Sequence, residues 1–379
     1  MRIRSTLAFT ALVTLTACGS PPATTPGSTS AAAPANAQAA PAPKPTPPQG
    51  WESGWADATT DKAVAAGTRS NAELSASLRP ADEARKHGFF SFAVDVRDPD
   101  GAAITKPLTA LAVSLDGKAV PGQWLARPLS DTGEAISVVV VLQATRSYTV
   151  GADDVPAPIQ TIKDGTLAFL KALPAQAKAS VMLFDNEGSR LLTPEAPVAD
   201  AVKALEAWSP ESKEASMAPP LYKSLTKAIS VATESASSHR YVLLVTDGKD
   251  RGNDDARGLA REIDEVATAA TSGHVQLLLF GCTLDMPEPL VNVNMLASKS
   301  NGSYRKIGDG TSCPAADLER AADHIKGRRV VGFRPTRDLG PDLQGVLQID
   351  AEIGGAWTRR TLEGATLPLG TLPTPPPTK

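Results

Sequence analysis

The first part of the folded chain, residues 87–130, alternates apolar and polar positions with a period of two. In Phe90–Arg97, apolar residues alternate with Ser91, Ala93, Asp95 and Arg97, which predicts a strand with one buried face. A second apolar run, Leu108–Leu115, ends at Asp116-Gly117, a dipeptide typical of hairpin turns. Residues 87–130 therefore predict a small β unit.

Residues 131–328 follow a different pattern, in which apolar runs alternate with stretches of helical period. Strands are expected at Ile136–Leu142, Val181–Phe184, Arg190–Leu192, Tyr241–Asp247, Val275–Phe280 and Ser303–Ile307. Helices are expected at Ile159–Leu173, Val198–Trp208, Leu221–Ala232, Ala256–Ala270 and from Cys313 to Gly327, and the segment 283–312, apart from its strand, is expected to be a loop. Apolar strands that alternate with helices predict an α/β fold, a doubly wound and mostly parallel sheet flanked by helices.

Residues 329–366 return to a period of two, with a turn at Gly354-Gly355. These strands either complete the 87–130 unit, with the α/β unit inserted between them, or form a separate decoration; we favour the shared β domain. Residues 51–86, with Trp51 and Trp55 near their start, read as a polar lead-in without a clear element.

The N-terminus resembles that of a bacterial lipoprotein. Arg2 and Arg4 precede an apolar run that is shorter than the about 20 residues a membrane helix needs. Leu15-Thr16-Ala17-Cys18 resembles a lipobox, so residues 1–18 are expected to be a signal peptide and Cys18 the lipidated residue. The alternative is an ordinary signal peptide with a chance cysteine. By the same resemblance, Gly19 favours the outer membrane of the cell envelope, facing the periplasm or the cell surface.

Composition limits the function further. Residues 19–50 are almost all Pro, Ala, Thr, Ser and Gly, which predicts a disordered tether, and 367–379 predict a second disordered tail. The net charge of −3 has no basic cluster that would favour nucleic-acid binding. No nucleophile–base pair, phosphate loop or metal-ligand spacing of the four histidines stands out, so no enzyme is expected. Asp95, Asp98 and Asp100 are interpreted as turn residues, and the acidic residues of 247–255 as a solvated loop with a helix cap.

Three stretches of the central unit resemble the von Willebrand factor type A domain family. They are VVVVLQATRS (138–147), APPLYKSLTKAI (218–229) and RYVLLVTDGKD (240–250), and the resemblance covers 131–328. It implies the α/β fold already expected. It also implies the position of a metal-ion-dependent adhesion site, whose pattern is Asp-x-Ser-x-Ser after the first strand, a Thr before the middle helix and an Asp after a later strand.

This adhesion-site pattern is degenerate here. Its first Asp falls on Gln143, its two serines on Thr145 and Ser147, its Thr on Pro219 and its last Asp on Asp247. Magnesium prefers hard oxygen ligands and gives up its water reluctantly, so one carboxylate predicts poor affinity and a domain without a cofactor. The alternative keeps a weakly bound Mg²⁺ on Thr145, Ser147 and Asp247, with Gln143 as a further ligand. A third hypothesis places Arg146 as a charge that replaces the ion beside Asp247.

The cysteines and the family resemblance complete the expectation. If Cys18 is lipidated, Cys282 and Cys313 remain as a pair, and a disulfide between them is expected in an oxidising compartment. The resemblance implies a membrane-anchored envelope lipoprotein whose type A domain binds a protein partner without catalysis. The alternatives are metal-dependent adhesion through an atypical site and a purely structural envelope component.

Overall fold

The computed structural model describes residues 50–78, 89–99, 102–145, 148, 158–209, 219–251, 256–282, 288–307, 315–336 and 343–367. The chain divides into two compact units, Met1–Pro43 and Lys44–Lys379, and all described residues belong to the second. The expected signal peptide with Cys18, the tether up to residue 49 and the tail from residue 368 lie outside the described residues. Within the described part, no helix is long and apolar enough to cross a membrane.

The central unit is built on a sheet with the strand order β12-β11-β10-β7-β8-β9. Its strands are β7 (Ile136–Gln143), β8 (Ala177–Asp185), β9 (Gly188–Pro197), β10 (His239–Thr246), β11 (Val275–Gly281) and β12 (Ser303–Lys306). All neighbouring strands are parallel except β8 and β9. Its helices are α4 (Pro158–Ala172), α5 (Val198–Ala207), α6 (Leu221–Glu234), α7 (Ala256–Ser272), α8 (Glu288–Ser300), α9 (Ala315–Glu319) and α10 (Ala321–Gly327).

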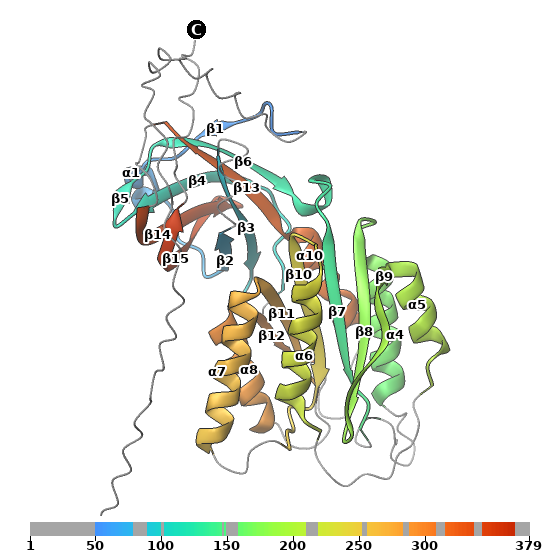
Figure 1. Cartoon of the computed structure of the whole chain (residues 1–379). Coiled ribbons are helices and arrows are strands. Elements are labelled where there is room, and N and C mark those ends of the chain that lie inside the picture. The colour runs from blue at the N-terminus through green and yellow to red at the C-terminus, as the bar shows by residue number, and fades with distance from the viewer. Residues whose placement is uncertain are drawn as a thin grey trace, which may run out of the picture. The chain divides into compact units, whose positions relative to one another are not determined.

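Helices cover both faces of this sheet, as the nearly continuous apolar strands require (Figure 1). Val138, Val140 and Leu142 of β7 face a core formed with α4, α5, α9 and α10. Val139 and Val141 face the opposite core, which α6, α7 and α8 close. The expected α/β fold with a mostly parallel sheet is confirmed.

Two further sheets contain strands from both sides of the α/β unit. One has the order β1 (Ala56–Asp57), β6 (Gly122–Pro128), β13 (Arg329–Pro335), β3 (Phe90–Arg97) and β2 (Glu73–Leu78). The other has the order β15 (Ala356–Leu367), β14 (Leu343–Ile353), β4 (Leu108–Leu115) and β5 (Lys118–Ala119). β13 pairs with β3 and β6, and β14 pairs with β4, so the strands before and after the insertion share one apolar core.

The lead-in at 51–86 contributes elements to this β domain. It contains β1, α1 (Asp61–Ala66) and β2, and a short 3₁₀ helix η1 (Leu129–Asp131) later joins the β domain to the α/β unit. Trp51 stacks on Phe89 with ring centroids 5.1 Å apart, and Trp55 meets the same ring edge-on at 5.2 Å. The aromatic residues therefore anchor the start of the folded chain.

The structure corrects four expectations. Strand β3 is buried on both faces rather than one, because its polar side packs against the α/β unit; Asp95 is an ion-pair residue there and not a turn residue. The expected loop over 283–312 contains α8, whose Leu290, Val293 and Ala297 pack into the core at helical spacing. The last helix is two short helices, α9 and α10, that meet at Arg320.

Candidate functional site

The candidate site lies where β7 and β10 end side by side. The two strands are parallel and paired up to Leu142 and Val245, so the residues that follow meet at the carboxyl edge of the sheet. Gln143 closes β7, and Asp247 follows β10 directly. In open α/β sheets, ligands bind beyond this edge. Two of the positions expected from the sequence are therefore brought together.

The side-chain amide of Gln143 is the centre of a closed hydrogen-bond network. Its Nε2 donates to Thr145 Oγ1 at 2.8 Å and to Asp247 Oδ1 at 3.0 Å. Its Oε1 accepts from Thr246 Oγ1 at 2.7 Å and from the Asp247 backbone N–H at 3.1 Å. The Gln143 amide thus donates two hydrogen bonds and accepts two. The residue is only 1% exposed.

Donor and acceptor complementarity fixes the orientation of this amide. An amide side chain has two N–H donors on one end and one acceptor oxygen on the other. If it were reversed, its oxygen would face the Asp247 carboxylate and its nitrogen would face the Asp247 backbone N–H, so two attractive contacts would become repulsive. The amino group of Gln143 therefore points at the oxygen atoms that a cation would need.

The loop after β10 is held by its own backbone. Lys249 N–H donates to Asp247 Oδ1 at 3.0 Å, and Gly248 N–H donates to Thr246 Oγ1 at 3.0 Å. Gly248 has φ of +81°, and a Cβ there would lie 2.8 Å from the backbone of Pro289 at the start of α8, so glycine is required on two counts. The loop is thus built to hold the Asp247 carboxylate in place.

Pro219 takes part through its carbonyl and not through a side-chain ligand. Its oxygen accepts from the backbone N–H groups of Leu221 and Arg251, each at 3.0 Å. The second bond ties the loop after β10 to the start of α6. Proline brings no hydroxyl, so this position offers only a carbonyl that two donors already occupy.

Tyr148 is a residue that the sequence did not single out. Its hydroxyl donates to the backbone oxygen of Cys282, and its own N–H donates to Thr145 O at 2.9 Å. The ring is 1% exposed, so it pins the loop after β7 against the end of β11. The sequence feature that could have pointed to Tyr148 is its position, as an aromatic residue directly after the hydroxyl-rich loop.

Several expected residues have no described structure. Arg146, Ser147 and Cys313 lie outside the described residues. The Arg146–Asp247 pairing therefore stays a prediction, and so does the Cys282–Cys313 disulfide. Cys282 itself is fully buried at the end of β11.

The described donor set fits a divalent cation poorly. The network of Gln143, Thr145, Thr246 and Asp247 contains one carboxylate, that of Asp247, which is 3% exposed. Asp247 Oδ1 and Thr145 Oγ1 already accept hydrogen bonds from the Gln143 amino group. No group of three or more His, Cys, Asp or Glu side chains is arranged to hold a metal ion in the part of the chain that the structure describes. Chemically, the arrangement can lock two strand ends together without a charge at its centre.

Fold and site together define an α/β protein with its candidate binding edge at the carboxyl ends of a mostly parallel sheet. Residues 151–306 match the family model of the von Willebrand factor type A domain. Type A domains are typically non-enzymatic modules that mediate protein–protein interaction or adhesion. No curated protein matches the chain.

Solved structures with similar folds include bacterial and pilus proteins. A conserved hypothetical protein, BatB from Bacteroides thetaiotaomicron, is 17% identical over 50% of this chain and 97% of its own, with a TM-score of 0.38. A von Willebrand factor type A protein from Catenulispora acidiphila is 14% identical over 79% and 74%, with a TM-score of 0.40. The PilB minor pilin of Streptococcus sanguinis is 8% identical over 67% and 77%, with a TM-score of 0.41.

Proposed function

We propose that the type A domain binds a protein partner at the carboxyl edge of its sheet without a divalent cation and without catalysis. The observation that carries this proposal is the Gln143 amide, whose amino group donates to Thr145 and Asp247 where an ion would need their oxygens. A cation that entered would have to displace two buried hydrogen bonds. It would gain a single carboxylate in return.

Charge makes this exchange unfavourable. Mg²⁺ keeps several waters unless carboxylates compensate its charge, and it is bound at about 2.0–2.1 Å by near-octahedral oxygens. The amide satisfies the same protein oxygens at 2.8 and 3.0 Å with no charge to desolvate. The site would therefore be fully assembled without metal, and a partner would not need to supply a carboxylate to an open coordination position.

The partner would contact the rim of this edge, because the network itself is buried. Gln143, Thr145 and Asp247 are 1%, 7% and 3% exposed. Arg251, at the rim, is exposed, and its Nη1 donates to the backbone oxygen of Asn186 at 3.0 Å, which joins the loop after β10 to the β8–β9 turn. A rim of this kind presents backbone and side-chain donors around a rigid centre.

The test is affinity capture from cell-envelope extract with the full chain, in EDTA and in Mg²⁺. Equal capture of a specific partner in both conditions supports the proposal. Arg251→Glu should weaken capture, while Arg261→Glu should not, because Arg261 is an exposed residue of α7 with the same charge change. Capture that requires Mg²⁺ would overturn the metal-free proposal, and capture unaffected by Arg251→Glu would overturn the proposed edge.

We also propose that the domain is lipid-anchored in the bacterial envelope, outer membrane favoured, through Cys18 and the tether at 19–50. Stable anchoring needs more than one acyl chain, which a lipidated N-terminal cysteine supplies. Mass spectrometry of the mature N-terminus should find an acylated Cys18, and Cys18→Ser should release the protein from membranes. A membrane-bound Cys18→Ser protein would contradict the anchor.

A further inference from the structure

A cavity lies at the opposite edge of the α/β sheet from Gln143. It has a volume of about 460 Å³ and is bounded by β2, by β15 and by the first residues of β11. Pockets of about 300–1,000 Å³ are typical for small ligands. Neither the family match nor the proposed function assigns a role to this cavity, which sits where the β domain meets the α/β unit.

The cavity is lined by apolar side chains and by polar side chains that are basic or neutral. Arg328 and Arg360 contribute guanidinium groups, and Ser75, Ser77 and Thr361 contribute hydroxyls. None of the described residues that line it is an aspartate or a glutamate. A cavity with two guanidiniums and no lining carboxylate has an electrostatic preference for anions.

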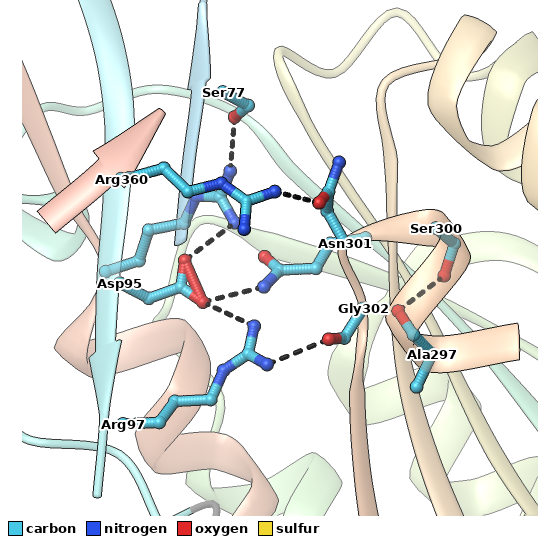
Figure 2. A network of polar contacts seen from close by, with 10 residues as sticks. Ser77, Asp95, Arg97, Ala297, Ser300, Asn301, Gly302 and Arg360 are labelled. Carbon is cyan, nitrogen blue, oxygen red and sulfur yellow. Dashed lines mark hydrogen bonds and ion pairs between the residues drawn. The ribbon is translucent and has the colours of Figure 1, made fainter. Parts of the chain in front are cut away.

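The groups behind the cavity leave its positive charge in place, because the charges of Asp95 and Arg97 cancel. Asp95 accepts from Arg97 at 3.0 Å and from Gln276 at 2.8 Å, and its other oxygen lies 3.5 Å from Arg328 (Figure 2). Arg97 reaches across to the backbone oxygen of Gly302 at 2.8 Å. Asp95 is thus one carboxylate beside two buried guanidiniums, and Arg360 brings a third to the cavity.

Several buried polar atoms at this cavity have no hydrogen-bond partner among the described residues. The Nε–H donors of Arg328 and Arg360 are both unpaired, and so is the acceptor Gln276 Oε1. Arg328 is 8% exposed, and its Nη2 donates to Ser77 Oγ. Its guanidinium also lies 5.6 Å from the ring centroid of Tyr241. These contacts hold the side chain in place, while its Nε–H has no acceptor among the described residues. A buried donor without a partner destabilises the fold, and a suitable ligand would recover that free energy.

We infer that this cavity is a binding site for a small oxyanion, a carboxylate or a phosphate, held by Arg328 and Arg360. Guanidinium groups form strong charge-assisted hydrogen bonds with both anions. The unpaired Gln276 oxygen favours a ligand that also carries a donor, as the last residues of a peptide chain do. Binding there would join β2, β15 and the α/β unit through one ligand.

Asn301 offers a conservative way to block the site. Its Oδ1 accepts from Arg360 Nη2 at the mouth of the cavity, and Figure 2 shows the two side chains facing each other. Asn301 has φ of +55°, a conformation that aspartate also tolerates. Asn301→Asp would therefore keep the backbone and the contact, and place a competing carboxylate against Arg360.

The experiment is an NMR titration of the full chain that follows the Nε–H signals of Arg328 and Arg360 at constant ionic strength. The probes are N-acetyl-dialanine, which has a free carboxylate, its C-terminal amide, and inorganic phosphate. Saturable shifts of both signals with the free carboxylate or with phosphate, but not with the amide, are expected. The peptide and phosphate arms distinguish the two sources of the anion.

Variants make the outcome specific. Asn301→Asp and Arg360→Gln should each weaken anion binding at least about tenfold, because each variant loses one charge-assisted hydrogen bond to the anion. Arg261→Gln, which removes one charge from α7, should leave it unchanged. Thermal unfolding of each variant verifies folding. The inference is overturned if neither anion gives saturable shifts, or if Asn301→Asp binds as tightly as the unchanged chain.

Discussion

Replacing Gln143 by Glu changes one group of the network and keeps its shape. The Nε2 that donates to Asp247 at 3.0 Å and to Thr145 at 2.8 Å becomes an oxygen. The Thr145 hydroxyl can turn and donate instead, but the contact with Asp247 becomes a pair of buried carboxylates. A hydrogen bond to a charged group contributes about 1.5–3 kcal/mol, and a neutral one about 1 kcal/mol. We expect Gln143→Glu to lower the free energy of unfolding by about 3 kcal/mol in EDTA.

The assay is urea unfolding, with a matched control in the same chain. Gln160 on α4 donates to Asp164 at 2.9 Å in an exposed pair, so Gln160→Glu makes the same chemical change where water screens it. That control should cost less than about 1 kcal/mol. With two carboxylates, the Gln143→Glu site should also gain Mg²⁺ binding, and an ion at 100 times its dissociation constant would restore about 2.7 kcal/mol. A loss at Gln143 no larger than at Gln160 would refute the central role of the amide.

Three further predictions concern the domain interface and the cysteines. Asp95→Asn should lower the free energy of unfolding by about 3–5 kcal/mol in urea titrations, because two buried guanidiniums lose their carboxylate; a loss below about 1 kcal/mol would contradict the ion-pair account. Burial, with a smaller contribution from nearby Arg97, lowers the pKa of His324 to about 4, so the unfolded chain binds a proton first as pH falls below 6.5. Between pH 7 and 5, the free energy of unfolding of the unchanged chain should therefore fall by about 2 kcal/mol more than that of His324→Leu in paired urea titrations. Parallel pH profiles of the two proteins would contradict this. Non-reducing peptide mapping should recover Cys282 linked to Cys313, a bridge worth roughly 3 kcal/mol, and alkylation of both thiols without reductant would exclude it.

The sequence predicted the α/β unit well because its four central strands, β7, β8, β10 and β11, are buried on both faces. Runs such as Ile136–Leu142 leave no polar face that would fit another environment, and stripes such as that of α7 specify an amphipathic helix. The two site positions Gln143 and Asp247 were predicted from the family resemblance, and they meet because β7 and β10 are adjacent parallel strands. What periodicity did not provide was the orientation of the amide, which depends on donors and acceptors 104 residues apart.

The polar side of β3 could not be read from its own pattern. Alternation in Phe90–Arg97 normally means that one face meets water, yet Asp95 is 2% and Arg97 3% exposed. The partners of Asp95, Gln276 and Arg328, lie about 180 and 230 residues further along the chain, and no local rule connects them. The missed helix α8 is different, since its apolar spacing was present and a single proline at its first turn, Pro289, is compatible with a helix start.

The most direct test of the metal-free account is isothermal titration calorimetry of Mg²⁺ and Mn²⁺ into the unchanged full chain after EDTA treatment. With the Gln143 amide donating to Thr145 and Asp247, we expect no saturable heat up to millimolar concentrations of either ion. Binding in the micromolar range that Asp247→Ala abolishes would contradict the account, because it would mean that the ion displaces the amide and takes its oxygens.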